Sequence, residues 1–495
     1  MMKNAVTEMH SYAQSLRQLD KDHVIHPYTD FSTFFEEGSQ VIVGADGVHV
    51  EDAEGKRYLD AIGGLWCVNI GHGRREMADC IAEQVMSMQY YNPFGHTTNA
   101  PASLLAGKLA DIAPGDLNHV FYSCGGSTAN DTALRLVHYY SNMRGKQRKK
   151  KIISRNNAYH GSTYVVANLT GIHGTKQGLD RICDDWIHHV SAAGMYRRPI
   201  GAEGLSEDEY CDFLVNEFEN RIIQLGEDTV AAFIAEPIMG AGGVLVAPRG
   251  YHKRMYDICK KYDMLYIADE VVTAFGRLGE WFASESVFGI QPDIICIAKG
   301  LTSGYIPLGA TLLSDDIYKA ISQPQCQGGT LSMGYTYTAH PVACAAALKN
   351  IEIMEREHIP DNVKQLGPYF LESLKTLHDI DIVGDVRGSH FMLGVELVQD
   401  KQSKLSFPYE AQITQRVFRR ALERGLVVRP VGNTLVLSPP LILSREHIDT
   451  IVETLRTSDH TLGDASRPGL DAKVDVQSAN VAIHGGVPLG ERRVQ

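Results

Sequence analysis

The sequence predicts an α/β protein: a mostly parallel β-sheet with helices on both faces, joined to a smaller α+β domain made from both chain ends. The chain has 495 residues, more than a single hydrophobic core sustains, so we expect at least two domains. From about residue 75, short apolar runs alternate with amphipathic helical stretches, which is the pattern of βαβ units. After about residue 340 that alternation gives way to a long helix and antiparallel-looking strands.

The N-terminal part predicts a polar helix and then a small antiparallel sheet. Residues 1–20 have no apolar core of the kind a secretion signal needs, and they are typical of a short polar helix. Residues 41–64 alternate apolar and polar side chains between glycine-containing turns, which favours short antiparallel strands. We expect residues 1–70 to supply this segment and part of the smaller domain.

Residues 71–340 predict the large domain. The expected strands of its parallel sheet are His119–Ser123, Lys151–Ser154, Ala231–Ala235, Leu265–Ala268 and Ile294–Ala298. The expected helices between them include Asn130–Tyr140, Glu207–Leu225 and Gly250–Tyr262. Ser206 directly precedes the second of these helices, where its hydroxyl is suited to cap the helix N-terminus.

The C-terminal part predicts the rest of the smaller domain, over residues 341–460. A helix covers about residues 340–358, and the runs at 390–398 and 426–442 are strand-like and expected to be antiparallel. We expect this part to combine in space with the N-terminal sheet. Residues 461–495 are polar with several Gly and Pro, and we expect this tail to be mobile or to lie over the surface.

Bulk composition excludes several function classes. A net charge of −12 gives no support to a nucleic-acid partner. The chain has no apolar run of about 18 residues, so no membrane span is predicted. The nine cysteines are scattered without CxxC spacing, which favours free thiols in a reducing cytoplasm. His188 and His189 lack partners at ligand spacing, so no metal site is expected.

A glycine-containing loop links the predicted strand at 119–123 to the helix after it. The sequence there is Gly125-Gly126-Ser127-Thr128, and Ser127 or Asn130 could cap the helix. A helix N-terminus offers free N–H groups and the positive end of the helix dipole, which suits a phosphate. A tight turn without any ligand explains the loop equally well. The loop matches neither GxGxxG nor GxxxxGK[ST], so a dinucleotide or P-loop site gains little support.

Two neighbouring predicted strands end in charged side chains. Asp269 follows the run Leu265–Ala268, and Lys299 follows Ile294–Ala298 between that run and a glycine-rich stretch. Each residue alone is as easily a helix cap or a solvated surface group. Ligands of such sheets bind at the carboxyl ends of the strands. A phosphate loop, an acid and a lysine at one edge fit pyridoxal phosphate, with the lysine as its Schiff base and the acid on its pyridine nitrogen.

Several longer motifs carry a family resemblance, and they occur in a matching order and spacing. They are NAYHGST, AEPIMGAGGV, ADEVVTAFGRLGEWFASE, IAKGLTSGYIPLGA and GYTYTAHPVA. With them, the chain from about His26 to Thr457 resembles the class III, or ω-type, aminotransferases of the pyridoxal phosphate fold type I superfamily. Among these it looks most like the ω-amino acid or amine:pyruvate aminotransferases.

The resemblance implies the roles of the residues around the cofactor ring. Lys299 would form the Schiff base and then act as general base and acid, and Asp269 would pair with the pyridine nitrogen. Val271 would pack on one face of the ring and Tyr159 on the other. Glu236 would lie in the shell of residues behind the ring, although a structural acid before a Pro turn is nearly as good an interpretation.

The resemblance also implies how the phosphate is bound. Gly126 and Ser127 would contact it, and Thr336 would reach the phosphate of a neighbouring subunit. A homodimer or a dimer of dimers with shared sites is therefore expected. Many relatives have Gly-Ser-Glu-Ala-Asn in the phosphate loop, whereas this chain has Thr128 at the position of the glutamate. Any role of that glutamate is lost here.

Substrate binding is expected from an aromatic lining and one arginine. Trp66 and Phe94 match positions that line the pocket of relatives, with Tyr159 beside them, although Trp66 is also a good candidate for a core residue. Arg429 matches a mobile arginine that holds a substrate carboxylate with its planar two-pronged guanidinium. A surface salt bridge is the alternative for Arg429.

The expected reaction is a ping-pong transamination from an amine donor to an α-keto acid acceptor. The donors in question are β-alanine, taurine, 4-aminobutyrate, putrescine and simple aryl amines, and the resemblance favours pyruvate as the acceptor. The alternatives are a 2-oxoglutarate-using aminotransferase, an aminomutase or a decarboxylase with the same cofactor. A non-catalytic protein that holds a nucleotide in the glycine loop is a further alternative, but it leaves the pairing of Asp269 with Lys299 unexplained.

Overall fold

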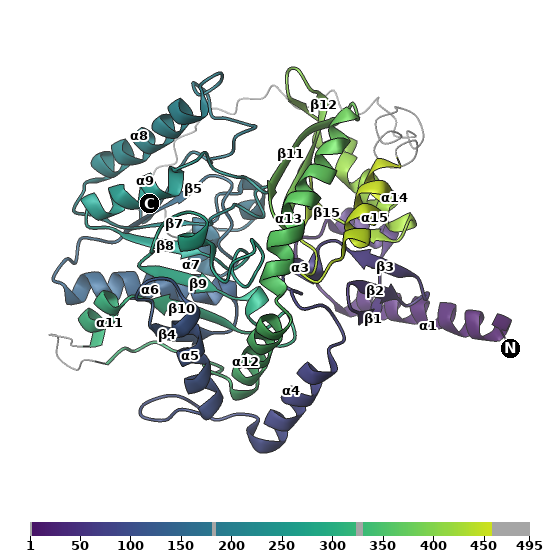
Figure 1. Cartoon of the computed structure of the whole chain (residues 1–495), viewed down its shortest axis with the longest axis horizontal. Helices are drawn as coiled ribbons and strands as arrows, with labels where there is room; N and C mark the ends of the chain where they lie inside the picture. The colour runs from purple at the N-terminus through teal and green to yellow at the C-terminus, as the bar shows by residue number, and fades with distance from the viewer. Residues whose placement is uncertain (1, 181–184, 323–329, 458–495) are drawn as a thin grey trace, which may run out of the picture.

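The computed structural model describes residues 2–180, 185–322 and 330–457, which form a large α/β unit beside two smaller sheets (Figure 1). The polar tail predicted at 461–495 lies outside the described residues. The N-terminal helix α1 extends away from the body of the molecule, next to the smaller sheets. The predicted fold class, a mostly parallel sheet with a smaller α+β part, is confirmed.

The described part of the chain contains the following strands: β1 (Ile42–Asp46), β2 (His49–Asp52), β3 (Arg57–Asp60), β4 (His119–Ser123), β5 (Lys151–Arg155), β6 (Ile187–Val190), β7 (Val230–Ala235), β8 (Leu265–Asp269), β9 (Ile294–Ile297), β10 (Gly309–Leu313), β11 (Val383–Ser389), β12 (Met392–Asp400), β13 (Leu405–Ser406), β14 (Leu426–Val427), β15 (Arg429–Val431) and β16 (Thr434–Leu437).

The α-helices are α1 (Met2–His23), α2 (Phe31–Glu37), α3 (Gly63–Trp66), α4 (Arg75–Met88), α5 (Ala100–Ile112), α6 (Gly126–Met143), α7 (Tyr164–Leu169), α8 (Glu207–Leu225), α9 (Tyr251–Lys261), α10 (Ala283–Ser286), α11 (Asp315–Ser322), α12 (Pro341–Arg356), α13 (Ile359–Lys375), α14 (Ile413–Glu423) and α15 (Arg445–Arg456). Short 3₁₀ turns are η1 (His173–Lys176), η2 (Lys299–Leu301), η3 (Thr376–Asp379) and η4 (Tyr409–Ala411).

The large sheet has seven strands in the order β4-β10-β9-β8-β7-β5-β6. The pairings from β9 through β8, β7 and β5 to β6 are parallel, whereas β10 is antiparallel to both β9 and β4. The strand β10 was absent from the sequence-based expectation, because its short apolar run directly follows the glycine-rich stretch after Lys299. The carboxyl ends of β5, β7, β8 and β9 therefore lie along one edge.

Both faces of this sheet are covered, as the uninterrupted apolar runs predict. On β7, Phe233 packs in one core cluster and Ile234 in the other, and on β8 Tyr266 and Ile267 divide in the same way. One cluster includes side chains of α5, α8, α9 and α12, and the other includes side chains of α6, α7 and α11. A one-residue slip of a strand would exchange its two faces, so dense packing on both sides fixes the register.

The smaller sheets are made from both chain ends. The first has the order β1-β2-β3-β14, and the C-terminal strand β14 pairs in parallel with β3. The second is antiparallel in the order β11-β12-β16-β15, with β13 added to β12. The union of N- and C-terminal segments in one sheet is thus as expected, and the exact domain limits stay a prediction.

One expected helix boundary was wrong. The helix after the glycine loop begins at Gly126 with Gly125 as its N-cap residue, not at Asn130, and no side chain caps it. Ser127 and Asn130 therefore lie inside the first two turns rather than at a cap. The N–H groups of this first turn are consequently left without a side-chain acceptor.

Two further predictions concern the cysteines and membrane-spanning helices. Each cysteine that the structure describes is a free thiol, in line with the scattered spacing, and Cys183 and Cys326 lie outside the described residues. Within residues 2–180, 185–322 and 330–457, the structure contains no helix long and apolar enough to cross a membrane.

We predict that Ser206→Ala lowers the stability of the large domain without changing the chemistry. Ser206 caps α8 with a complete capping box, in which its hydroxyl accepts from the N–H of Glu209 and the carboxylate of Glu209 accepts from the N–H of Ser206. Losing such a cap costs about 1 kcal/mol. Thermal unfolding measures the change, and Ser206→Asp should retain most of the wild-type stability. Equal melting temperatures for the Ala and Asp variants would contradict the cap's contribution.

Candidate active site

A cavity of about 480 Å³ opens at the carboxyl edge of the large sheet. It brings together residues that follow β5, β7, β8 and β9 with residues from the N-terminal segment and from β15. It is lined by Tyr28, Leu65, Trp66, Gly126, Ser127, Asn130, Tyr159, His160, Gly161, Ile172, Thr175, Glu236, Ile238, Ala241, Asp269, Val271, Val272, Thr273, Lys299, Arg429, Pro430 and Val431. Nine of the eleven site residues expected from the sequence thus line one cavity.

Asp269 is held in this cavity by several hydrogen bonds to its carboxylate. It ends β8 and is buried, and its Oδ2 accepts hydrogen bonds from His160 Nδ1 at 2.8 Å and from Asn130 Nδ2 at 2.7 Å. Its Oδ1 accepts from the backbone N–H of Val271 at 3.2 Å. Because a carboxylate only accepts, Nδ1 of His160 carries the proton of this hydrogen bond.

Lys299, unlike Asp269, is not held by hydrogen bonds from its side chain. Its backbone has φ of 43°, in the left-handed region that non-glycine residues rarely adopt, at the start of the turn η2. Among the described residues, its amine has no hydrogen-bond partner. Burial lowers the pKa of the Lys299 amine, an effect that Asp269 opposes. A lysine held this way has a larger neutral fraction near neutral pH, and a neutral amine is the form that attacks a carbonyl.

The loop before α6 forms a close-packed cradle. A Cβ on Gly126 would lie 2.9 Å from Cγ1 of Val271, and a Cβ on Gly161 would lie 2.8 Å from Cα of Ser127. Ser127 Oγ also accepts from the N–H of Ser162 at 3.1 Å. Only hydrogen atoms fit at the two glycine positions, so the backbones of both loops come close to whatever the cradle holds.

Thr128 has a structural function in this cradle. Its Oγ1 donates to the carbonyl of Gly125 at 2.9 Å and accepts from the N–H of Cys124 at 3.1 Å. The hydroxyl therefore closes the turn that leads from β4 into α6. Thr128, which replaces the glutamate found in many relatives, therefore stabilises the loop itself.

Glu236 fixes the backbone around Tyr159. Its carboxylate accepts from the N–H of Tyr159 at 3.0 Å and from the N–H of Gly240 at 2.8 Å, and burial raises its pKa. The Tyr159 hydroxyl lies 3.0 Å from Ser162 Oγ and accepts from the Tyr28 hydroxyl at 3.3 Å. Burial raises the pKa of Tyr159 to about 12, so its hydroxyl stays neutral. The two loops that hold Tyr159 and Glu236 are thus one hydrogen-bonded unit.

Trp66 and Arg429 line the cavity from the smaller domain. Trp66 is buried, packs in a core cluster with Ile238 and Met392, and also lines the cavity, so the core and pocket interpretations both hold. Arg429 begins β15 and is half-buried. In the part of the chain that the structure describes, its guanidinium has no carboxylate or hydrogen-bond partner. Burial lowers the pKa of Arg429, and Tyr159 and Tyr28 oppose this effect.

Phe94 and Thr336 lie apart from this cavity within one chain. Phe94 lines a second cavity, of about 680 Å³, together with residues 330–334. The carbonyl of Thr336 accepts from the hydroxyl of Tyr90, which belongs to the same stretch as Phe94. Neither of these two expected residues lines the first cavity, whereas the nine others do.

Sequence reasoning missed several residues of the cavity, and three of these make hydrogen bonds to expected site residues. His160 adjoins Tyr159 in the motif YHG, and a histidine beside an expected ring contact was the available signal. Asn130 was considered only as a helix cap, although an amide one turn into the helix is well placed to reach a neighbouring strand end. Tyr28 belongs to the segment between α1 and α2, and its sequence context carries no signal for this position.

The residues of the cavity fit pyridoxal phosphate. The cradle at the open N-terminus of α6 suits the phosphate, and a lysine amine without a partner suits covalent attachment. His160 Nε2 and Asn130 Oδ1 are buried without a hydrogen-bond partner among the described residues, on the side chains that hold Asp269. Such unpaired buried atoms are rare in proteins and call for a partner outside the chain.

Comparison with known proteins agrees with this geometry. The family model for class III aminotransferases matches residues 35–458. The chain is 40% identical to a putrescine–pyruvate aminotransferase of Pseudomonas aeruginosa over 88% of this chain and 94% of that protein. It is 38% identical to a mitochondrial γ-aminobutyrate transaminase of rice, Oryza sativa subsp. indica, over 83% of this chain and 79% of that protein. The crystal structure of an (S)-enantioselective ω-transaminase from Thermomicrobium roseum superposes with a TM-score of 0.88 at 40% identity, covering 92% of this chain and 99% of that chain.

We predict that Gly161→Ala weakens cofactor retention. The new Cβ would overlap Ser127, and Gly161 has φ of 135°, which strains any L side chain. Displacement of the cradle should raise the dissociation constant of pyridoxal phosphate by at least about tenfold, as loss of about 1.4 kcal/mol implies. Equilibrium dialysis measures it, and Gly107→Ala, at an exposed helical glycine with open space around its Cα, is the control. Unchanged retention in Gly161→Ala would show that the cradle does not hold the cofactor.

We also predict that Lys299→Met stabilises the cofactor-free protein at neutral pH. The pKa of Lys299 is lower in the folded protein than in the unfolded chain, so the unfolded state binds more protons between the two values. The stability of the wild type is lowest below the folded pKa, and it recovers as pH rises from the folded pKa to the unfolded one. The gain in melting temperature from Lys299→Met should therefore shrink towards high pH. A gain that is independent of pH would contradict the depressed pKa.

Proposed function

The chain belongs to the class III aminotransferases, and we propose that it transfers an amino group from an ω-amino acid or a primary amine to pyruvate. The observation that carries this proposal is the unpaired guanidinium of Arg429 in the same cavity as Asp269 and Lys299. A single cation suits the single carboxylate of pyruvate, and much of the remaining lining is apolar. The relative named as a putrescine–pyruvate aminotransferase supports the same pair of substrate classes.

As an enzyme of this family the chain uses pyridoxal phosphate, which when bound supplies an electron-withdrawing ring that stabilises negative charge on the carbon next to the transferred nitrogen. The residues that would hold it are those of the cavity. Gly126 and Ser127 would bind the phosphate, and Val271 and Tyr159 would contact the two faces of the ring. Glu236 would act from behind the ring by fixing the backbone of Tyr159.

Lys299 is proposed to attach the cofactor and then to move a proton. Its amine has no competing partner among the described residues, and its lowered pKa increases the fraction of neutral amine, the form that accepts a proton from carbon. The same amine then returns that proton to the neighbouring carbon. A base with this role needs a pKa closer to the working pH than that of a free lysine, and burial shifts the pKa of Lys299 in that direction.

Asp269 is proposed to keep a proton on the pyridine nitrogen. His160 and Asn130 both donate hydrogen bonds to Oδ2 of this carboxylate. Those two donors occupy one oxygen, and Oδ1 accepts only the longer bond from the N–H of Val271. Oδ1 therefore retains accepting capacity, which suits it to a charge-assisted hydrogen bond with the cofactor.

The donor and acceptor are proposed to use the cavity in turn, in a ping-pong order. Arg429 would hold the carboxylate of the keto acid with its two-pronged guanidinium. An amine donor without a carboxylate would instead contact the apolar lining, including Leu65, Trp66 and Ile238. Among the donors, β-alanine, taurine, 4-aminobutyrate, putrescine and aryl amines are the compounds to compare.

We propose that the enzyme works in the cytoplasm as a homodimer, or a dimer of dimers, in which each cavity is completed across the interface. Tyr91, Phe94 and Tyr337 are 52%, 53% and 60% exposed. Tyr337 adjoins Thr336, and Tyr91 and Phe94 follow Tyr90, whose hydroxyl donates to the carbonyl of Thr336. Clustered exposed aromatic side chains are typical of an interaction surface. Phe94 of the partner subunit would line the substrate cavity, and Thr336 of the partner subunit would contact the phosphate.

The first test of the proposal is the visible spectrum of the purified enzyme. Addition of the true amine donor should bleach the absorption band of the lysine-bound cofactor, and pyruvate should restore it. Lys299→Ala should lack that band and lose turnover by several orders of magnitude. Restoration by 2-oxoglutarate but not by pyruvate would overturn the proposed acceptor, and normal turnover of Lys299→Ala would overturn the assignment of the lysine.

We predict that Arg429→Leu separates the two substrates. Loss of a hydrogen-bonded ion pair of about 1.5–3 kcal/mol should raise the KM for pyruvate roughly 10- to 100-fold. The half-reaction with an amine that lacks a carboxylate should proceed at close to the wild-type rate, because that donor has no carboxylate for Arg429 to hold. Stopped-flow measurement of each half-reaction tests this, with Arg249→Leu, at an exposed arginine, as control. Equal losses with both substrates would contradict the role of Arg429.

A further inference from the structure

The loop that follows Lys299 is held from behind by one buried side chain, Asn350 of α12. Asn350 has no exposed surface, and its Nδ2 donates to the carbonyl of Gly300 at 2.9 Å and to the carbonyl of Leu301 at 3.0 Å. Its Oδ1 accepts from the hydroxyl of Ser303 at 2.6 Å. A single amide therefore contacts three of the four residues that come directly after Lys299.

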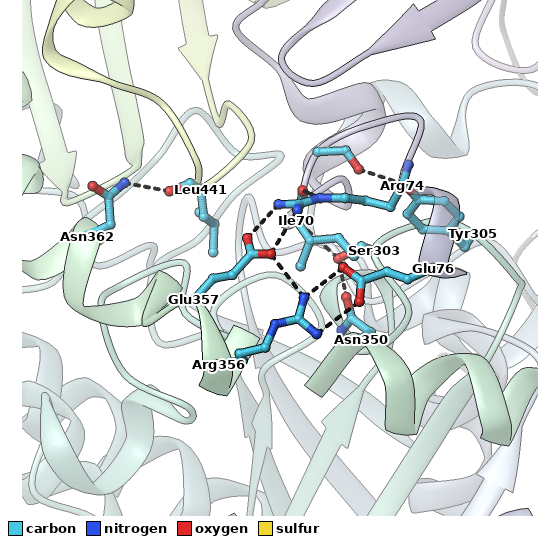
Figure 2. Close-up of polar contacts among 11 residues, drawn as sticks. Ile70, Arg74, Glu76, Ser303, Tyr305, Asn350, Arg356, Glu357, Asn362 and Leu441 are labelled. Carbon is cyan, nitrogen blue, oxygen red and sulfur yellow. Dashed lines mark hydrogen bonds and ion pairs between the residues drawn. The ribbon is translucent and has the colours of Figure 1, made fainter. Parts of the chain in front are cut away.

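The direction of each hydrogen bond in this group is determined. The carbonyls of Gly300 and Leu301 can only accept, so the side-chain NH₂ group of Asn350 faces them. The amide oxygen Oδ1 therefore faces Ser303. Oδ1 cannot donate, so the hydroxyl of Ser303 donates to it. Ser303 Oγ is then free to accept from the N–H of Ile70 at 3.2 Å. Figure 2 shows the hydrogen bonds that link Ile70 to Ser303 and Ser303 to Asn350. From Asn350 the chain of hydrogen bonds continues to the carbonyls of Gly300 and Leu301.

The held loop has an unfavourable backbone conformation. Lys299 has φ of 43° and Ser303 has φ of 49°, both in the left-handed region. Each such residue costs of order 1 kcal/mol and persists only where the surroundings over-determine it. The contacts of Asn350 lie between these two residues. Without them, the loop would be free to relax towards ordinary backbone angles, and the Lys299 side chain would move with it.

The helix that carries Asn350 is itself fixed at its C-terminal end. Arg74 makes a two-pronged ion pair with Glu357 at 2.9 and 2.8 Å, and Arg356 makes another with Glu76 at 2.9 and 2.7 Å. The N–H of Arg74 also donates to the hydroxyl of Tyr305, just beyond the loop. Figure 2 shows these residues close to Ser303 and Asn350. Asn350 therefore acts from a helix that cannot easily shift relative to the loop.

We propose that Asn350 is a positioning residue for Lys299, which fixes the loop after the lysine and thereby the place of its amine in the cavity. The proposal rests on the function proposed for Lys299. A lysine that has to reach two neighbouring carbons depends on a placement accurate to a fraction of an ångström. No atom of Asn350 lines the cavity, so its effect is exerted through the backbone.

The test replaces Asn350 by Leu, whose side chain has the same number and branching of heavy atoms and no hydrogen-bonding atoms. Asn362→Leu is the matched control, because Asn362 Nδ2 also donates to two backbone carbonyls, those of Leu441 and Leu443, which do not belong to the loop. Ser303→Ala removes only the hydroxyl that joins the loop to Asn350, and it serves as the second variant if Asn350→Leu does not fold.

The first readout uses the cofactor-free protein. The rate at which an active-ester reagent acylates Lys299 is followed against pH by peptide mass spectrometry. Release of the loop should hydrate the amine and raise its pKa, so the midpoint of this profile should move to higher pH in Asn350→Leu and in Ser303→Ala. The second readout is the donor half-reaction of the cofactor-loaded enzyme, which should slow by roughly 10- to 100-fold in Asn350→Leu.

Asn362→Leu should keep the wild-type midpoint and half-reaction rate even if its melting temperature falls as far as that of Asn350→Leu. A wild-type acylation midpoint in both Asn350→Leu and Ser303→Ala would overturn the proposal. So would equal shifts in Asn350→Leu and Asn362→Leu, because general destabilisation would then explain them. Failure of the proposed function is distinguishable, because the wild-type enzyme itself would then lack the donor-sensitive visible band.

Discussion

The parallel pairing of β8 with β9 is the constraint on which the rest of the site depends. Asp269 is in register with Cys296, and Lys299 follows three residues later, just past the end of β9. Adjacent strands are about 4.8 Å apart, so the acid and the amine reach the same edge without any special side-chain contact between them. Burial on both faces holds this register, and the residues after β5 and β7 arrive at the edge for the same reason. The chemistry therefore begins in the backbone pairing of the sheet.

The polar groups around that edge fall into two kinds. Asp269 and Glu236 have their hydrogen bonds supplied by the chain, whereas Lys299 and Arg429 have no partner among the described residues. Arg277 gives a useful contrast, because it is fully buried yet its guanidinium donates to the carbonyls of Phe391 and Pro439 and to Asn69. That arginine joins the loop after β8 to the smaller domain. Lys299 and Arg429 differ from Arg277 in that no hydrogen-bond partner for either is found among the residues that the structure describes.

The extent to which the sequence predicts the site depends on how local each signal is. The strands and the charged residues at their ends could be predicted, because apolar runs and the residues that terminate them are contiguous in sequence. The hydrogen bonds to Asp269 could not, since His160 and Asn130 are more than a hundred residues away along the chain. The antiparallel strand β10 was missed because its run is short and merges with the loop before it. The start of α6 was placed four residues late. The prediction looked for a side chain that caps the helix, but α6 begins at Gly126 without one. Phe94 and Thr336 stay predictions, because within one chain neither lines the cavity that contains Asp269 and Lys299.

The parallel pairing of β14 with β3 has a consequence for synthesis of the chain. Leu426 is in register with Leu59, so the sheet that begins with the N-terminal strands is finished only when the last part of the chain appears. At about 5–20 residues per second, the ribosome needs roughly 20–70 s to make the segment between them. During that time β3 presents an unpaired edge, and Arg429, two residues past β14, has not been made. The nascent large domain is therefore able to acquire Asp269 and Lys299 well before the residue that would receive the substrate carboxylate.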